Sequence, residues 1–182
     1  MKTKVIIFQH NQSFLLIYLF YLYINLVEEK KLFKYAIYYL SKYDSSKKNL
    51  IEVLKRKIFK LNITGIEKHK LIHYIDKILI ELEKNNLIDD SRYCISKITM
   101  LARTGKSKNF ILSYLIKKGI NKIEIRNSFD EFEKNNDDWE LNSAKLFAKK
   151  KRLLDSNENY QKKIAKMGRA GFSYSICKKI LS

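Results

Sequence analysis

Apolar residues recur along this chain at the three- and four-residue spacing of amphipathic helices, from about residue 31 to the last residue. The clearest stripe covers residues 71–82, where Leu and Ile lie one, three and four positions apart, and Asn85-Asn86 follows it. Similar stripes cover residues 32–40 and 50–58, the second preceded by Ser45, a residue type that caps helix N-termini. The pattern predicts three helices within residues 31–88.

The same order then recurs twice. Each recurrence begins with a pair of aspartates, Asp89-Asp90 and Asp137-Asp138, which we interpret as helix N-caps. The predicted helices after the first pair end at Gly105, begin again at Ser107 and begin again at Asn121. Those after the second pair cover residues 139–152, 160–167 and 173–181. The count is nine helices.

A helix joint is written twice, as Lys117-Lys118-Gly119-Ile120-Asn121 and as Arg169-Ala170-Gly171-Phe172-Ser173. In each, the glycine can take a positive φ just after one helix, and an apolar residue follows it. The Asn or Ser then caps the next helix. Repetition at this period is typical of stacked helical units, which present surfaces rather than a deep pocket.

We therefore predict an all-α fold of three helical units, at residues 31–88, 89–136 and 137–182. Residues 1–30 form an apolar N-terminal extension of uncertain role. Phe14 to Val27 is almost wholly apolar and follows Lys2 and Lys4, but it is shorter than the roughly 20 residues of a bilayer span and no small-residue cleavage site follows it. A buried or partner-covered helix, or a poorly ordered extension, is favoured over a membrane anchor or a signal peptide.

Composition supports a helical fold, because the chain has no proline and five glycines in 182 residues. The net charge of +18 is spread along the chain, with +1 in residues 1–30, +5 in 31–90, +6 in 91–136 and +6 in 137–182. Such a distribution is expected of a protein that lies along a polyanion or an acidic partner. A lysine-rich composition also arises from an AT-rich genome.

Nothing in the sequence predicts an enzyme, a cofactor or a metal. Cys94 and Cys177 form no C-x-x-C pattern, which favours a reducing cytoplasm over disulfides or zinc. His69 and His73 have metal-ligand spacing, but Lys70 replaces the glutamate of H-E-x-x-H and no third ligand is evident. No nucleophile–base pair or glycine-rich phosphate loop is present.

Two sets of cations are candidates for partner or nucleic-acid binding, with a solvated helix face as the alternative for each. The first set is Arg103, Lys106, Lys108, Lys117 and Lys118. The second set is Lys149, Lys150, Lys151, Arg152, Lys162, Lys163, Lys166 and Arg169.

Four tyrosines follow an apolar stripe, at positions 35, 38, 39 and 43. Because a base-stacking ring must be exposed beside the cations, we interpret these four as core or interface residues.

Three motifs resemble the RecX family of RecA recombinase regulators. Leu87-Ile88-Asp89-Asp90-Ser91-Arg92-Tyr93 is similar to the start of the family's second repeat, which adds Arg92 to the candidate binding residues. Residues 111–120 are similar to its I-x-x-x-L-x-x-K-G-I segment, and Gly171-Phe172-Ser173-Tyr174 is similar to its last helix. The first unit departs from the family, with Lys57-Ile58 in place of a glycine joint and an extra loop at residues 59–69.

The resemblance covers residues 31–182 and implies three tandem three-helix repeats stacked into an elongated, curved body. It also implies a non-enzymatic, cytoplasmic protein that binds the RecA filament and inhibits its growth and activity, with single- or double-stranded DNA as a further partner. The alternative is a helical nucleic-acid-binding protein that acts without a recombinase. A membrane-associated protein held by residues 14–27 is less favoured.

Overall fold

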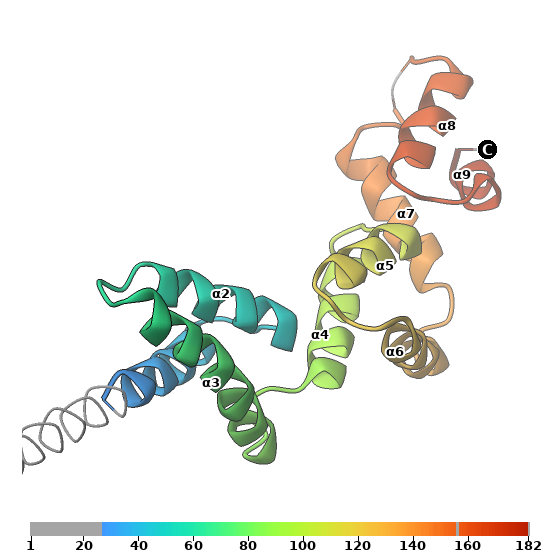
Figure 1. Ribbon diagram of the computed structural model, residues 1–182. Coiled ribbons are helices and arrows are strands. Elements are labelled where there is room, and N and C mark those ends of the chain that lie inside the picture. The colour runs from blue at the N-terminus through green and yellow to red at the C-terminus, as the bar shows by residue number, and fades with distance from the viewer. Residues whose placement is uncertain (1–26, 156, 182) are drawn as a thin grey trace, which may run out of the picture. The chain divides into compact units, whose positions relative to one another are not determined.

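The computed structural model describes residues 27–155 and 157–181, and all regular secondary structure in these residues is helical (Figure 1). Residues 27–42 are helical, so this helix includes residues before the predicted start at 31. The other helices are α2 (Lys47–Phe59), α3 (Gly65–Lys84), α4 (Asp90–Arg103), α5 (Lys108–Lys117), α6 (Lys122–Lys134), α7 (Trp139–Lys150), α8 (Tyr160–Arg169) and α9 (Tyr174–Leu181). The predicted all-α class is confirmed. Most of the apolar run at Phe14 to Val27 lies outside the described residues.

The helices form two compact units. The first includes residues 27–44 and 50–88, and the second includes residues 45–49 and 89–181. The short segment that opens α2 thus belongs with the second unit, while the rest of α2 belongs with the first.

Buried apolar side chains gather in three cores, one in the first unit and two in the second, an arrangement that fits the three predicted repeats. The first core comprises Leu32, Ala36, Leu50, Leu54, Ile58, Leu71, Ile75, Ile78, Leu82 and Ile88. The second comprises Tyr93, Cys94, Ile98, Leu101, Ala102, Ile111, Leu115, Ile120, Ile125 and Phe129. The third comprises Ala144, Ala148, Leu153, Met167, Phe172 and Cys177.

The predicted glycine joints are confirmed. Gly119 and Gly171 have φ of 84° and 92°. In the first joint the N–H of Ile120 donates to the carbonyl of Leu115 (3.2 Å), and in the second Phe172 donates to Met167 (3.2 Å). This is the six-to-one bond of a Schellman motif, and it leaves the residue after each glycine buried in a core. Gly105, with φ of 87°, ends α4 in the same way.

Serine hydroxyls join these helix ends to the start of other helices in the second unit. The Ser107 Oγ caps α5 by accepting from the N–H of Phe110 (3.1 Å) and donates to the carbonyl of Ala170 (2.7 Å). The Ser46 Oγ likewise accepts from the N–H of Asn49 (3.3 Å) and donates to the carbonyl of Lys118 (2.7 Å). Each hydroxyl therefore satisfies an orphan donor and an orphan acceptor of two helix ends.

Two predicted caps are wrong. The cap of α2 is Ser46, because the Ser45 Oγ instead donates to the Ser46 carbonyl and accepts from the side chain of Asn49. Asp138 occupies the N-cap position of α7, but its φ of 48° is left-handed and its carboxylate makes no capping bond. Asp89 does cap α4, accepting from the N–H groups of Ser91 (2.8 Å) and Arg92 (3.2 Å).

The tyrosine prediction is wrong for two of four rings. Tyr38 and Tyr43 are 62% and 60% exposed, whereas Tyr35 and Tyr39 are partly buried against the first core. An apolar stripe that is broader than the buried face of its helix leaves its flanking residues in solvent.

The three joint glycines should all tolerate alanine poorly. A Cβ on Gly105 would lie 3.2 Å from the backbone nitrogen of Phe147, and a Cβ on Gly171 would lie 2.5 Å from the Ser107 Oγ. A Cβ on Gly119 would lie 2.5 Å from the Cβ of Lys48, which rotation of that side chain cannot move away. We expect each of the three alanine variants to lower the free energy of unfolding by about 2–4 kcal/mol in chemical denaturation.

Gly168→Ala is the matched control for these glycine variants. Gly168 lies inside α8 with open space around its Cβ position, so alanine should be neutral or stabilise by about 0.5–1 kcal/mol. Equal effects at all four glycines would contradict the assigned joint geometry.

Ser107→Ala should lower the free energy of unfolding by about 1–3 kcal/mol, because it removes both the α5 cap and the donor to Ala170. Ser113→Ala, on the exposed side of the same helix, removes a hydroxyl of the same kind and should change stability little. Equal stability of the two variants would show that the Ser107 bonds contribute nothing.

Candidate functional site

The fourteen cations predicted to bind a partner all lie in the second unit, most of them at or near helix ends. Arg92 and Arg103 are in α4, Lys106 is in the α4–α5 joint, and Lys108 and Lys117 open and close α5. Lys118 is the C-cap of α5, Lys149 and Lys150 end α7, Lys151 is its C-cap, and Arg152 follows. Lys162, Lys163, Lys166 and Arg169 are in α8.

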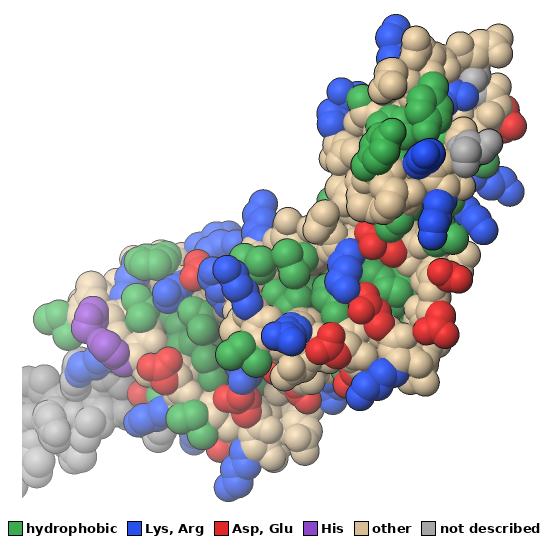
Figure 2. Space-filling model, turned by 90° about the vertical axis from the view of Figure 1, so that its right-hand side faces the viewer, with side chains coloured by type: hydrophobic (Ala, Val, Ile, Leu, Met, Phe, Trp, Pro, Cys, Tyr) green, Lys and Arg blue, Asp and Glu red, His purple; other side chains and the backbone are tan. Residues whose placement is uncertain are grey.

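Acidic residues are absent from the sequence around most of these cations. Residues 91–123 contain eight Lys or Arg and no Asp or Glu, and residues 141–154 contain five and none. The acids of this part of the chain fall mainly in residues 124–140. On the face drawn in Figure 2, Lys and Arg side chains (blue) are spread over the surface, with acidic side chains (red) among them.

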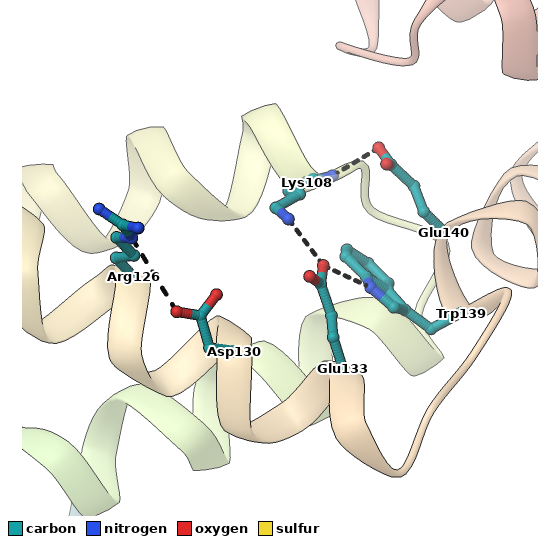
Figure 3. A network of polar contacts seen from close by, with 6 residues as sticks. All are labelled: Lys108, Arg126, Asp130, Glu133, Trp139 and Glu140. Carbon is teal, nitrogen blue, oxygen red and sulfur yellow. Dashed lines mark hydrogen bonds and ion pairs between the residues drawn. The ribbon is translucent and has the colours of Figure 1, made fainter.

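Lys108, a partly exposed residue, is held in place by a polar network (Figure 3). Its Nζ forms an ion pair with Glu133 (2.7 Å), whose carboxylate also accepts from the indole N–H of Trp139 (3.1 Å). Its backbone N–H donates to Glu140 (2.9 Å), and its Nζ lies 5.1 Å from the centre of the Phe129 ring. The charge of Lys108 is therefore already matched by α6 and α7.

Glu133 has a pKa below its ordinary value. Burial on its own would raise that pKa, but the hydrogen bonds from Lys108 and Trp139 and the charge of Lys108 together outweigh it. The carboxylate therefore stays ionised and keeps Lys108 in place near neutral pH.

Four further cations have partners within the described residues. Lys166 pairs with Glu158, and Lys118 donates to the side chain of Asn49 (3.2 Å). Lys106 lies 4.5 Å from the centre of the Phe110 ring, and Lys150 donates to the carbonyl of Thr104 (3.1 Å). These contacts orient the side chains, although each leaves part of its cation accessible.

Four exposed cations lie where the α4–α5 joint meets the joint that ends α7 at Arg152. The α4–α5 joint packs against α7, because the Ser143 Oγ donates to the carbonyl of Lys106 (2.8 Å) and Lys150 reaches Thr104. Arg103, Lys149, Lys151 and Arg152 surround this meeting point, and all four are exposed. No ion pair within the described residues holds any of them.

Two open pockets flank Trp139 in the second unit, with volumes of about 340 and 330 Å³. Half of the residues that line the first are acidic or amide, including Glu133, Asp137 and Asp138, and its lining also includes Lys108 and Lys179.

The two cysteines lie in the cores of the second unit. Cys94 and Cys177 are buried and free, and burial raises the pKa of both thiols. The rings of His69 and His73 pack edge to face, 4.5 Å apart. Among the described residues, no group of three His, Cys, Asp or Glu is close enough to hold a metal ion.

No helix in residues 27–155 or 157–181 combines the length and the apolar character that crossing a bilayer requires.

The sequence identifies the candidate cations, but it does not predict which of them pair with other residues of the chain. The partners of Lys108 lie 25 and 32 residues further along, in helices whose packing no local pattern reveals. The left-handed backbone of Arg152 (φ of 51°) was also missed, because arginine gives no signal for that conformation.

Comparison with known proteins places this helical fold in a class of regulatory proteins. No family model matches the sequence. The chain is 27% identical over 154 residues to "Regulatory protein RecX" of Myxococcus xanthus, a match that covers 80% of this chain and 81% of that protein. It is 30% identical over 152 residues to the protein of the same name from Clostridioides difficile, covering 81% of this chain and 65% of that one.

Two solved structures have the same fold. A crystal structure of regulatory protein RecX superposes with a TM-score of 0.65 at 22% identity, covering 86% of this chain and 73% of the other. RecX from Lactobacillus salivarius gives 0.63 at 24% identity, covering 86% and 96%. The chain is therefore similar in sequence to proteins of the RecX family, and it shares their fold.

Replacing Glu133 by Gln should lower the melting temperature near pH 7, because the Lys108 and Trp139 contacts lose a charged acceptor. A carboxyl with a lowered folded-state pKa adds stability above its unfolded pKa of about 4.3, and this stability is lost as the pH falls through the folded value. The melting curves of parent and variant should therefore converge as the pH falls below about 4. A difference that stays constant down to about pH 3 would contradict this assignment.

Proposed function

We propose that this chain is a regulator without catalytic activity that binds RecA recombinase filaments, inhibits their growth and activity, and so modulates recombination and DNA repair. Sequence similarity to two proteins named regulatory protein RecX is the observation that carries this proposal. RecA, the cytoplasm and the DNA of the filament are the partners and the setting that the family resemblance implies.

The physical properties of the second unit support such a role. Exposed cations at the meeting point of the two joints lie in sequence segments without acids, and a filament of recombinase and DNA offers both acidic protein groups and phosphates.

The alternative is a helical nucleic-acid-binding protein that acts without a recombinase. The acid-free segments favour this alternative as much as the first proposal. Their cations can bind nucleic-acid phosphates with release of counterions, and this binding needs no recombinase. The two candidates differ only in whether RecA activity responds to the protein.

The parent protein should inhibit ATP hydrolysis by RecA on single-stranded DNA in a dose-dependent way, and more weakly as salt rises. The triple variant Arg103→Gln, Lys149→Gln and Lys151→Gln removes three exposed charges from the meeting point of the joints. It should need several-fold more protein for the same inhibition, while circular dichroism should show nearly unchanged helix content, because Gln and Lys have similar helix propensity.

The control is Lys34→Gln, Lys60→Gln and Lys84→Gln, which removes the same charge from exposed positions of the first unit. We expect this control to inhibit like the parent. Equal weakening of both triple variants would indicate non-specific attraction. If the parent binds DNA but leaves ATP hydrolysis and strand exchange unchanged at low salt, the RecA proposal is wrong and the alternative is supported.

A further inference from the structure

Five helices in the described residues end with the same backbone arrangement. In each, a residue with positive φ follows the helix, and the N–H of the next residue donates to a carbonyl five positions back. The positive-φ residues are Asn86, Gly105, Gly119, Arg152 and Gly171. At Arg152 the bond runs from Leu153 to Ala148 (2.9 Å), and Leu153 is buried in the third core.

Arginine is the unfavourable residue in this set. Glycine takes a positive φ without a Cβ clash, and asparagine visits the left-handed region more readily than most residues. Every other residue brings its Cβ close to the following carbonyl oxygen, and arginine lacks the short polar side chain whose local hydrogen bonds offset this cost in asparagine. The chain places glycine at the end of α4, the helix that α7 packs against, but places arginine at the end of α7 itself.

The Arg152 side chain makes no polar contact that would stabilise the described part of the fold. The Arg152 side chain is exposed, and no described residue forms an ion pair or hydrogen bond with its guanidinium. The packing role at this helix end belongs to Leu153, which needs a positive φ before it but no particular side chain there. A strained residue with no structural partner is a reason to look for a functional one.

The surroundings of Arg152 are suited to an anion. Lys149 and Lys151 are next to it, and Arg103 lies at the neighbouring joint that Lys150 ties to the end of α7. The nearest acid along the chain is Asp155, three residues further on and also exposed. The planar guanidinium donates two parallel hydrogen bonds to phosphate, which an ammonium group cannot do.

We propose that Arg152 contacts the phosphate backbone of nucleic acid, and that the strained end of α7 is kept because its side chain makes this contact. The inference deepens the proposed function, on which it rests for the presence of DNA in the filament. Nucleic acid is favoured over an acidic protein because one strand supplies phosphates at a short, regular spacing. Several cations in a row can therefore be neutralised at once, with release of counterions.

The test is Arg152→Gly, measured for stability and for binding to labelled oligothymidylate. Glycine relieves the backbone strain, so the melting temperature should rise by roughly 2–4 °C. Affinity for the single strand should fall about three- to tenfold, and the slope of log affinity against log salt should become shallower by about 0.7, the value for one lost phosphate contact. Arg152→Lys should recover most of the salt slope but only part of the affinity.

Two controls separate the backbone effect from the charge effect. Asn86→Gly makes the same backbone change at an equivalent helix end of the first unit without removing charge, and should leave the oligonucleotide affinity unchanged. Lys122→Gln removes one exposed charge from the start of α6, and should neither raise the melting temperature nor reduce binding as much as Arg152→Gly.

A lower melting temperature for Arg152→Gly would overturn the inference, because the arginine would then stabilise the fold. Unchanged binding to both single- and double-stranded DNA would also overturn it, and a selective loss of binding to polyglutamate would assign the joint to an acidic protein instead. The RecA assay tests the proposed function separately. If Arg152→Gly loses DNA binding but the parent does not inhibit RecA, this inference holds and the proposed function is wrong.

Discussion

Helix ends are the constraint on which the second unit depends. A helix leaves its last carbonyl groups unsatisfied, and in this unit four helices close that end with a left-handed residue and a returning N–H bond. The turn directs the next residue inward, which is how Ile120, Leu153 and Phe172 reach their cores. Short helices are marginal alone, so these apolar anchors and the cores around them supply the stability that propensity cannot.

The same ends also bring separate helices together. A glycine at the end of α8 lets the start of α5 approach closely enough for the Ser107 hydroxyl to reach the carbonyl of Ala170. A Cβ on Gly171 would occupy the space of that hydroxyl. Two features therefore favour glycine at position 171, its positive φ and the close approach of Ser107. The Ser107 hydroxyl in turn supplies hydrogen bonds to backbone groups that would otherwise be left unpaired on burial.

Much of this fold could be predicted from sequence because its signals are local. Apolar periodicity predicted the helices, and the glycine followed by an apolar residue predicted the joints at 119 and 171. The prediction failed where tertiary contact decides: Ser46 rather than Ser45 caps α2 because Ser46 also meets the carbonyl of Lys118. The ion pair of Lys108 with Glu133 was likewise invisible, since its partners are distant in sequence.

The charged residues of the second unit include paired and unpaired groups. The acids of residues 124–140 supply Glu133 and Glu140, which hold Lys108 through its side chain and its backbone. The exposed cations Arg103, Lys149, Lys151 and Arg152 have no ion-pair partner within the described residues. Surface ion pairs contribute little to stability, so leaving these four cations unpaired costs the fold little, and under the proposed function their charge would bind a polyanion.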